Sequence, residues 1–399
     1  MDPSTGSLSD LKVLELGSML AGPFVGTMLG DFGAEVVKVE KPGKPDALRE
    51  WPPHKNGEPL WWKTTSRNKK LITLDISRQE AKPIVLKLMA QADVVIENFR
   101  PGTMERWGLG PEELTKQFPR IVWARVSGWG QTGPNRDQGG YATIAEAFSG
   151  LASITGHADK GPSVSAFPMG DYLAGVFGAF GVLAALHHRD RSGAGQIVDV
   201  ALYEPLLRII ESVVVRFDQT GLKKPLLGNQ MEEDVPRNVY ATADGGAIAI
   251  SCGSQRIFEG LVDAMERPDL KSDPRYATMT DRVHHRDLID AEVAAWLRTQ
   301  STAIALEKLL NNKVVAGKVN DIADVLTDQH IAARDAIVSV VDSVLGPMRM
   351  PAPVPKLSAT PGRVKFTGGE PGSANAEVFQ NWCALGDADL LQLKKMKIV

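Results

Sequence analysis

The chain has 399 residues, of which 43% are hydrophobic and 23% are charged, and its formal net charge is -3. This composition is typical of a folded globular protein and excludes a mainly disordered chain. No block of basic residues stands out, so we expect no nucleic-acid partner. The length exceeds what one hydrophobic core usually organises and therefore favours two domains.

The cysteine content and the termini indicate where the protein works. Cys252 and Cys383 have no partner at a motif spacing, so we expect neither a disulfide framework nor a metal site. The first ten residues, MDPSTGSLSD, lack the basic and apolar pattern of a signal peptide. The longest uncharged apolar run, Tyr172 to Leu186, is shorter than the ~20 residues that span a bilayer. We therefore expect a cytoplasmic protein without a membrane partner.

Short β-rich runs alternate with helical segments through the first half of the chain. The predicted strands are residues 11–17 (LKVLELG), 35–40 (EVVKVE), 69–76 (KKLITLDI), 92–99 (ADVVIENF), 121–130 (IVWARVSGWG) and a short run at 163–168 (SVSAFP). A small-residue helix joins the first two strands, and a second helix is predicted at 77–91 with Ser77 as its cap. Residues 195–217 predict a strand followed by one long helix. This alternation predicts an α/β fold with a mostly parallel sheet.

In such a sheet, ligands bind beyond the carboxyl ends of the strands. The residues at or just beyond the carboxyl ends of the predicted strands are Gly17 to Leu20, Lys41, Glu97 to Phe99, and Ser127 to Trp129. We expect these residues to gather at one edge of the sheet and to form a binding site there.

The second half of the chain lacks the strand–helix alternation of the first half. Residues 238–252 predict a hairpin that turns at Asp244 to Gly246, and several helices follow to about residue 312. Residues 348–372 are rich in proline and glycine and predict an extended return strap, before a last helix at 387–396. We therefore divide the chain into a large domain (1–205), a linker (206–228), a small domain (229–329) and a C-terminal return to the large domain (330–399).

One acid, Asp171, lies at the start of the apolar segment FPMGDYLAGVFGAFGVLAAL. Taken alone, it is best interpreted as a helix N-cap, because aspartate is favoured there. Glycines 175, 178 and 181 allow this helix to pack closely against a neighbour. The first glycine-rich segment does not read G-x-G-x-x-G, so a nucleotide fingerprint is disfavoured. The paired histidines at 187–188 and 284–285 favour a solvated face over a metal site.

Taken together, five motifs resemble a known family. They are LKVLELGSMLAGPFVGTMLGDFGAEVVKVEKPG, SRNKKLITLD, DVVIENFRPGTMERWGL, VSGWGQTGP and the MGDYLAG segment. In this order they resemble the class III CoA-transferases, the group of formyl-CoA transferase and the carnitine CoA-transferases, over essentially the whole chain. The resemblance implies a Rossmann-like large domain with a smaller α+β domain. It also implies a homodimer of two interlocked, ring-shaped chains.

The resemblance identifies Asp171 as the catalytic nucleophile. It implies that a coenzyme A thioester is a substrate and that no cofactor is held permanently. Lys41 and Arg106 match the family's phosphate or ribose contacts. The adenine side matches Leu74 to Ser77 with Asn98 and Phe99, and the pantetheine channel matches Met19, Leu20, Trp107 and the segment Ser127, Gly128, Trp129, Gly130.

Departures from formyl-CoA transferase bear on the substrate. Leu20 replaces a glutamine of that enzyme, Ser127 replaces a lysine, and the glycine-run loop is missing. These changes argue against oxalate as the acceptor. The segments YATIAEAFSG and YEPLLRIIESVVVRFDQTG are more similar to members that pass CoA from succinyl-CoA to small dicarboxylates such as malate, citramalate or mesaconate. Glu146 and Arg216 are candidate residues near that acceptor.

Three other readings stay open. The α-methylacyl-CoA racemases share the fold but use a histidine where this chain has Tyr141, so one of their two bases is missing. An NAD-dependent oxidoreductase is weakened by the absent fingerprint. A non-enzymatic CoA-binding protein would bind CoA without becoming covalently loaded at Asp171.

Overall fold

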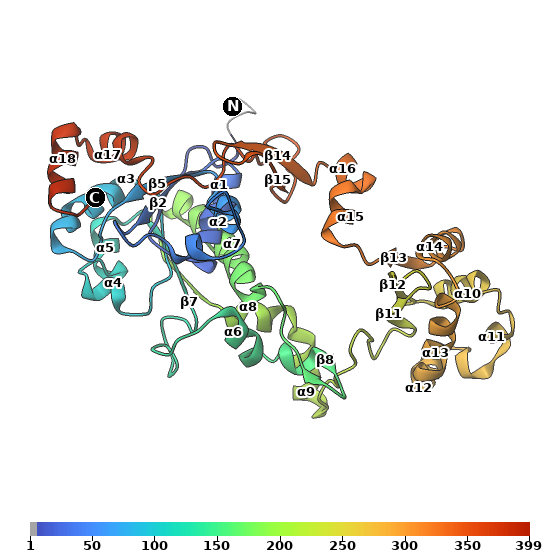
Figure 1. Cartoon of the computed structure of the whole chain (residues 1–399). Helices are drawn as coiled ribbons and strands as arrows, with labels where there is room; N and C mark the ends of the chain where they lie inside the picture. The colour runs from blue at the N-terminus through green and yellow to red at the C-terminus, as the bar shows by residue number, and fades with distance from the viewer. Residues whose placement is uncertain (1–5) are drawn as a thin grey trace. The chain divides into compact units, whose positions relative to one another are not determined.

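The structure is a computed structural model that describes residues 6–399. The chain forms two compact units. Figure 1 shows the ribbon coloured by residue number, from blue at the N-terminus to red at the C-terminus. Unit 1 comprises Met1–Leu151, Ser165–Thr220 and Ala332–Val399, and unit 2 comprises Ala152–Val164 and Gly221–Ile331. Each unit is therefore built from separate stretches of sequence, and residues 152–164 cluster with unit 2 rather than with the N-terminal part of the chain.

Unit 1 is built around a six-stranded sheet in which every neighbouring pair is parallel. The strands are β1 (Lys12–Glu15), β2 (Glu35–Glu40), β5 (Lys69–Thr73), β6 (Val94–Glu97), β7 (Val122–Ser127) and β10 (Ile197–Ala201). They lie in the order β10-β7-β6-β1-β2-β5. The chain runs outward from β1 to one edge through β2 and β5, then returns to β6 and runs to the other edge. This is the doubly wound, Rossmann-type order, and the parallel sheet predicted from the alternation is confirmed.

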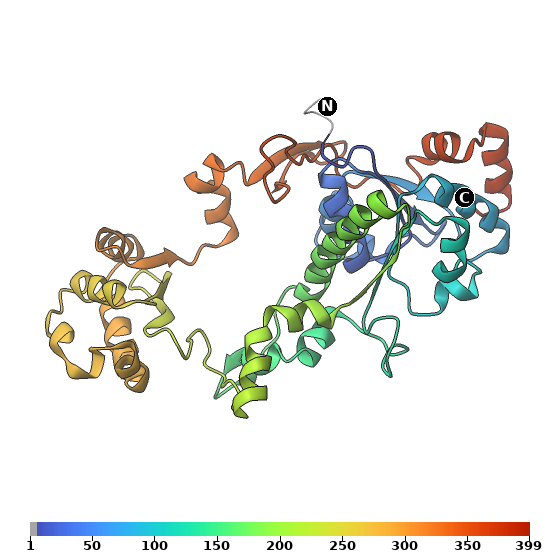
Figure 2. The ribbon, with the colours of Figure 1, turned by 180° about the vertical axis from the view of Figure 1, so that it is seen from behind.

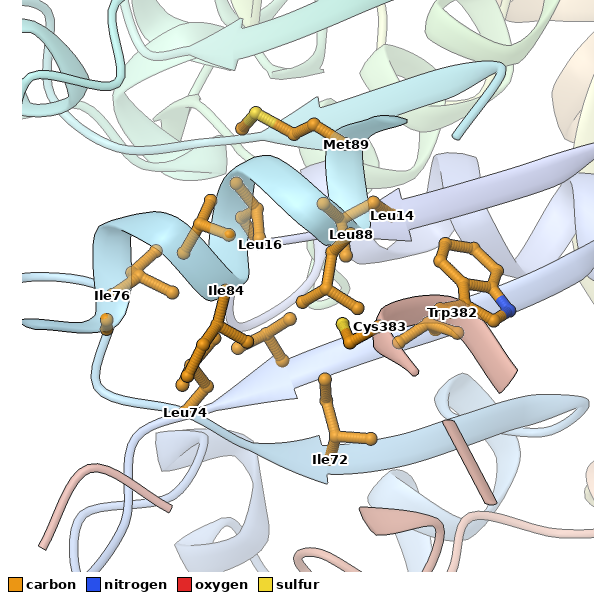
Figure 3. Packing of buried hydrophobic residues seen from close by; sticks show 14 of the residues in the cluster. Leu14, Leu16, Ile72, Leu74, Ile76, Ile84, Leu88, Met89, Trp382 and Cys383 are labelled. Carbon is orange, nitrogen blue, oxygen red and sulfur yellow. The ribbon is translucent and has the colours of Figure 1, made fainter. Parts of the chain in front are cut away.

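Helices cover both faces of this sheet. Along each strand, successive side chains point to opposite faces, so Val13 and Val36 pack toward α1 (Ala21–Asp31) and α7 (Met169–Ser192). Leu14 and Val37 pack on the other side. Figure 3 shows that side, where α3 (Lys82–Gln91) and α17 (Asn375–Cys383) lie over the strands. The C-terminal helix predicted at 387–396 is present as α18 (Asp387–Lys395), so the end of the chain completes the core of unit 1.

The helix that carries Asp171 packs closely against α1, and the two lie side by side in Figures 1 and 2. A Cβ atom added at Gly175 would lie 2.8 Å from Phe24, and one added at Gly178 would lie 2.8 Å from Val25. The two glycines therefore permit the close approach that the sequence predicted. By length and apolar composition alone α7 would be sufficient to span a membrane, a criterion that the core helix of a soluble protein also meets. It is longer than the run from Tyr172 to Leu186 indicated, because it extends to charged residues at its C-terminal end.

Three local predictions are wrong. Ser77 does not cap a helix, because its hydroxyl donates to Asp75 (2.6 Å), and α3 begins only at Lys82 after a short 3-10 turn. Residues 163–168 form no strand. The single long helix expected after β10 is broken at Ile210 into α8 (Tyr203–Ile209) and α9 (Glu211–Thr220).

Unit 2 contains a three-stranded antiparallel sheet in the order β11-β12-β13. The predicted hairpin is confirmed as β11 (Arg237–Ala241) and β12 (Ala247–Ser251), and β13 (Val315–Lys318) completes the sheet. Its helices are α10 (Gln255–Ala264), α11 (Asp269–Ser272), α12 (Met279–His284), α13 (Arg286–Leu297), α14 (Thr302–Asn311) and α15 (Ile322–Thr327), while α16 (Gln329–Ala333) ends where the chain re-enters unit 1. This unit has its own buried core around Phe258, Leu261 and Ile289.

The remaining elements are short. In unit 1 they are α2 (Leu60–Thr65), α4 (Thr103–Arg106), α5 (Pro111–Gln117), α6 (Ala142–Phe148), the hairpin of β3 (His54–Lys55) with β4 (Glu58–Pro59), and the hairpin of β14 (Ile337–Asp342) with β15 (Gly346–Pro351). Unit 2 also holds the pair β8 (Gly156–His157) and β9 (Gly161–Pro162). The predicted return strap begins in β15 and then runs without helix or strand to the turn before α17.

Candidate active site

The candidate site lies where the strand order of unit 1 reverses, between β1 and β6. Loops leaving these two neighbouring strands diverge to opposite faces of the sheet, and ligands of doubly wound sheets bind in the crevice so formed. Two cavities border the carboxyl ends of the strands here, and Ser18 and Phe99 line both. The edge of the sheet that the sequence predicted as a binding site is therefore hollowed.

The first hollow, the β2 cavity, has a volume of about 300 Å³ and lies beyond β1, β2 and β5. Five of the residues that the resemblance assigned to CoA line it together: Lys41, Leu74, Ser77, Phe99 and Trp107. Phe99 and Trp107 meet edge to face at 5.1 Å and supply apolar ring surfaces to the cavity wall. This shape and lining suit an aromatic base with a nearby anion.

The charge in the β2 cavity is carried by two lysines and their acidic neighbours. Lys41 Nζ lies 3.0 Å from Asp75 Oδ2 while half of its side chain stays exposed, and Lys44 lines the same cavity. Burial alone would raise the pKa of Asp75, but the Ser77 hydroxyl and Lys41 hold it below its ordinary value. Asp75 therefore stays ionised and holds Lys41 at the edge of the cavity.

The second hollow, the Asp171 cavity, has a volume of about 250 Å³. It gathers Asp171 with six other predicted residues, which are Met19, Leu20, Asn98, Phe99, Ser127 and Gly128. The N-termini of two helices border it, through Ala21 of α1 and Asp171 of α7. Backbone N–H groups at such ends stabilise negative charge that develops nearby.

Three of the residues that the resemblance assigned to CoA, Arg106, Trp129 and Gly130, line neither cavity. Arg106 donates to Thr103 Oγ1 (2.9 Å) on the exposed helix α4. Trp129 donates to the carbonyl of Gly139 (3.1 Å) and packs edge to face on Phe148, so it supports the loop that closes one side of the Asp171 cavity. The two acceptor candidates also lie elsewhere: Glu146 is buried with its carboxylate on Ser165, and Arg216 lies on α9.

Asp171 is in the first turn of α7 but is not its cap. The cap position is Pro168, and Asp171 is the third residue of the helix, so the N-cap interpretation is wrong. Within residues 6–399 its carboxylate forms no hydrogen bond or ion pair, and burial raises its pKa to about 6. A half-buried carboxylate without a partner is costly to the fold and is available for chemistry, which is the pattern of a functional acid.

An aromatic row runs beside Asp171. Phe167 stacks on Tyr172 at 4.8 Å, Trp61 stacks on Phe167 at 6.2 Å, and Trp51, which lines the Asp171 cavity, meets Trp61 edge to face at 5.2 Å. Trp61 Nε1 also donates to the Tyr172 hydroxyl (2.9 Å). Of these four aromatic residues, Trp51 lines the Asp171 cavity, so the row continues the apolar wall of that cavity outward.

Comparison with known proteins identifies the family. A model of the family described as CoA-transferase family III matches residues 8–373. This chain belongs to CoA-transferase family III. The enzyme is 44% identical over 394 residues to the succinyl-CoA–D-citramalate CoA-transferase of Chloroflexus aurantiacus, with 98% of each chain covered. It is 37% identical over 404 residues to the succinyl-CoA–L-malate CoA-transferase alpha subunit of the same species, covering 100% of this chain and 94% of that one.

Solved structures agree with this assignment. The crystal structure of a CaiB/BaiF family protein from Brucella suis matches the CoA-transferase with a TM-score of 0.85 at 28% identity, over 95% of this chain and 100% of that chain. The predicted family, its α/β fold with a central parallel sheet, and the enzyme class are thereby confirmed.

Sequence reasoning missed several charged residues of this CoA-transferase site. Arg100 and Arg136 line the Asp171 cavity, and Asp46 lines the β2 cavity beside Lys38. The one available signal was Lys38 itself, a lysine inside the valine-rich strand EVVKVE, which requires a buried partner. Nothing local indicated that Asp46 would be that partner.

The raised pKa of Asp171 predicts a pH-dependent gain in stability for Asp171→Asn. The folded chain favours the protonated acid, so ionisation of Asp171 destabilises the fold. This destabilisation is complete above pH 6 and disappears as the pH falls toward 4. Because the group is partly exposed, we discount the shift to about 1–2 kcal/mol. Urea unfolding of Asp171→Asn should show this gain at pH 8 and a much smaller one at pH 4.5.

The matched control for that measurement is Asp190→Asn, an exposed carboxylate on the same helix. It should change the free energy of unfolding little, and equally at both pH values. A gain for Asp171→Asn that is the same at pH 8 and pH 4.5 would contradict the burial of an ionised Asp171.

Proposed function

We propose that this enzyme transfers CoA from succinyl-CoA to a small dicarboxylate, with Asp171 as the covalent nucleophile. The observation that carries the proposal is the partner-free carboxylate of Asp171 in a cavity that shares the lining residues Ser18 and Phe99 with the β2 cavity. The names of both Chloroflexus relatives specify succinyl-CoA as donor and a small hydroxy-dicarboxylate as acceptor. The two names support the substrate class, and the Asp171 carboxylate in its cavity supports the covalent chemistry.

The first half of the reaction moves CoA onto the enzyme. An Asp171 oxygen attacks the thioester carbonyl, the C–S bond breaks, and CoA thiolate leaves a mixed aspartyl–succinyl anhydride. The thiolate then attacks the aspartyl carbonyl, the anhydride C–O bond breaks, and succinate departs from an aspartyl-CoA thioester. No proton is gained or lost, provided that Asp171 is ionised, which holds above pH 6.

The second half reverses these steps with the acceptor. The acceptor carboxylate attacks the carbonyl of the aspartyl thioester and expels the CoA thiolate. The product is a second anhydride, between Asp171 and the acceptor. The thiolate attacks the acceptor's acyl carbonyl, breaks the C–O bond, and regenerates the Asp171 carboxylate. In this mechanism, backbone N–H groups at the starts of α1 and α7 would stabilise the oxyanions of these steps, and the aromatic row would help to keep water from the anhydrides.

CoA is proposed to lie across the two cavities. Its adenine would occupy the β2 cavity against Leu74, Ser77, Phe99 and Trp107, with Lys41 on a phosphate. The pantetheine arm would pass Met19, Leu20 and Ser127 to reach Asp171. In this placement Arg106 and Trp129 act from outside the cavities, Arg106 by reaching a phosphate and Trp129 by supporting the channel wall.

The acceptor's second carboxylate needs a cation near Asp171. Arg100 and Arg136 line that cavity; Arg100 forms no ion pair within residues 6–399, and Arg136 has only Asp137 at 3.6 Å. We propose that these two arginines bind the carboxylate that does not react.

A homodimer working in the cytoplasm completes the proposal. Val176, Phe180 and Leu183 form an exposed apolar stripe on α7, and α9 has no buried residue, so a second copy that covers both helices would remove apolar surface from water. The interlocked rings implied by the family resemblance would provide that cover. The two cysteines are free and buried, in keeping with a reducing compartment.

An acceptor panel tests the substrate class. The enzyme is incubated with succinyl-CoA and, separately, with L-malate, D-citramalate, acetate, butyrate or oxalate, and new CoA esters are measured by liquid chromatography and mass spectrometry. We expect CoA esters of the hydroxy-dicarboxylates and little product from acetate, butyrate or oxalate. Efficient transfer to butyrate with none to either hydroxy-dicarboxylate would contradict the proposal.

A further inference from the structure

A four-residue loop, Gly17 to Leu20, separates the two cavities, and we call it the β1 loop because it follows that strand. Gly17 and Ser18 line the β2 cavity, while Ser18, Met19 and Leu20 line the Asp171 cavity. A CoA thioester that reaches from one cavity to the other must pass along this loop. Its conformation therefore sets the path between adenine and nucleophile.

Side chains from three separate segments hold the backbone of the β1 loop. Lys38 Nζ donates to the Gly17 carbonyl (2.9 Å). The Ser18 N–H donates to Asn98 Oδ1 and the Ser18 carbonyl accepts from Asn98 Nδ2, both at 2.8 Å. The Met19 N–H donates to both carboxylate oxygens of Asp46, at 3.0 and 3.1 Å. The backbone groups of three consecutive residues are thus held by side chains and not by other backbone groups.

We call Lys38, Asp46 and Asn98 together the clamp of the β1 loop. Its two charged members, Lys38 and Asp46, are themselves buried and paired. The Lys38 and Asp46 side chains are 0% and 2% exposed and lie 2.9 Å apart, and Lys38 also contacts Glu15 at 3.0 Å. Burial alone would lower the pKa of Lys38, but the carboxylates of Asp46 and Glu15 outweigh it and raise that pKa. Both charges therefore persist, and the loop is tied to a rigid site in the sheet.

The loop depends on this support because its conformation is not a relaxed one. Met19 has a φ of 66°, in the left-handed region that a residue with a side chain rarely adopts. A Cβ atom added at Gly17 would lie 2.4 Å from Asn98 Oδ1, so the amide of Asn98 packs directly on the loop. Both polar ends of Asn98 are occupied by Ser18, which distinguishes it from a free CoA ligand.

We propose that Lys38, Asp46 and Asn98 are positioning residues of CoA transfer, which hold the β1 loop in its substrate-binding shape before the thioester arrives. They act through the loop and touch neither reacting atom. The proposal rests on the proposed function, because it takes the loop to be the wall along which CoA passes. Fixing this loop in the free enzyme removes an ordering cost from binding and from the transition state.

The test compares Asp46→Asn and Asn98→Ala with Asp31→Asn as a matched control. Asp31 is also buried, 3% exposed, and paired with Arg67, but it lines neither cavity. Two readouts are taken well below the melting temperature of every variant. They are hydrogen–deuterium exchange of the peptide spanning residues 16–22 in the ligand-free protein, and steady-state transfer from succinyl-CoA to L-malate.

We expect amide exchange in the β1 loop at least about tenfold faster in Asp46→Asn and Asn98→Ala than in Asp31→Asn, with protection restored by CoA. We expect kcat/KM for succinyl-CoA to fall about 10- to 100-fold in both clamp variants and less than about twofold in the control, a difference that lost stability alone does not produce. If Asp46→Asn does not fold, Asn98→Ala keeps every buried ion pair and carries the test.

Two outcomes overturn the proposal in different ways. Transfer by the unmodified enzyme, with equal rates in the clamp variants and Asp31→Asn, overturns the positioning role alone. Absence of any CoA transfer or CoA binding by the unmodified enzyme overturns the proposed function, and with it the purpose of the clamp.

Discussion

Asp171→Ala should abolish covalent loading of the chain and lower the rate of CoA transfer by about 10,000-fold or more, as expected when a covalent nucleophile is removed. The physical reason is that within residues 6–399 no other carboxylate lines the Asp171 cavity. The cavity, its two arginines and the helix N-termini would remain, so CoA binding should change little. The variant thereby separates binding from chemistry.

The measurement is intact-protein mass spectrometry after incubation with succinyl-CoA. The unmodified chain should gain the mass of CoA less one water, as a thioester at Asp171 requires. Hydroxylamine should convert this adduct to a hydroxamate at residue 171, which peptide mapping locates. Asp190→Ala, a change at the far end of the same helix, should load as the unmodified chain does.

A CoA adduct that persists in Asp171→Ala would move the nucleophile to another residue. An unmodified chain that binds CoA tightly but never gains an adduct with any acyl-CoA donor would favour a non-covalent role. The pH profile adds an independent check, because transfer should lose about tenfold per pH unit below the Asp171 pKa of about 6.

Local patterns were sufficient to predict the sheet and its ligand-binding edge. Valine-rich runs such as EVVKVE are buried on both faces, and each ends at a glycine or charged residue where the chain must turn. Because the strands are parallel, the ends that lie far apart in sequence meet at one edge, so Lys41, Ser77 and Phe99 line one cavity. Their convergence follows from topology and needs no knowledge of side-chain contacts.

Two predictions failed because a polar side chain is hydrogen-bonded to a partner that the sequence pattern did not indicate. Ser77 has the composition of a helix cap, but Asp75 accepts its hydroxyl and turns the chain first. Glu146 was a candidate for the acceptor site, but its carboxylate accepts hydrogen bonds from the N–H and hydroxyl of Ser165, in the segment that leads to Asp171. Asp75 lies only two residues before Ser77, whereas Ser165 lies 19 residues after Glu146, and a single sequence contains no signal that selects either partner.

The clamp on the β1 loop shows the same limit at longer range. Asn98 lies at the end of its strand as predicted. Both polar atoms of its amide are hydrogen-bonded to the backbone of Ser18, so we assign it to holding the loop and not to contacting CoA. Asp46 lies in a polar loop, KPDALRE, where an acid is ordinarily solvated. Only the fold brings it to Lys38 and to the Met19 amide, so its importance is a property of tertiary structure.

The second large effect concerns the choice of acceptor. Replacing both Arg100 and Arg136 with methionine should lower kcat/KM for L-malate by about 100-fold, because each arginine contributes a charge-assisted hydrogen bond to the distal carboxylate. Methionine keeps the length and apolar bulk of the arginine stem, so the cavity wall is preserved. Transfer to butyrate, which lacks the second carboxylate, should fall less than about threefold or rise, since it never uses those bonds.

The single variants show how the arginines divide this role. Arg100 has no competing ion pair within the described residues, whereas Arg136 is partly neutralised by Asp137, so Arg100→Met should cost more than Arg136→Met. Arg208→Met, an exposed arginine on α8 that lines neither cavity, is the control and should leave both acceptors unaffected.

The CoA dissociation constant, measured by calorimetry, separates two explanations for a lost rate. If the arginines bind the acceptor, the double variant should bind CoA as the unmodified enzyme does and lose only dicarboxylate selectivity. If they bind a CoA phosphate instead, the dissociation constant should rise and transfer to L-malate and butyrate should fall together. Because the two acceptors share the same donor half-reaction, a change in their ratio can arise only after aspartyl-CoA has formed. The ratio therefore reports on recognition at the Asp171 cavity, independently of how CoA is held in the β2 cavity.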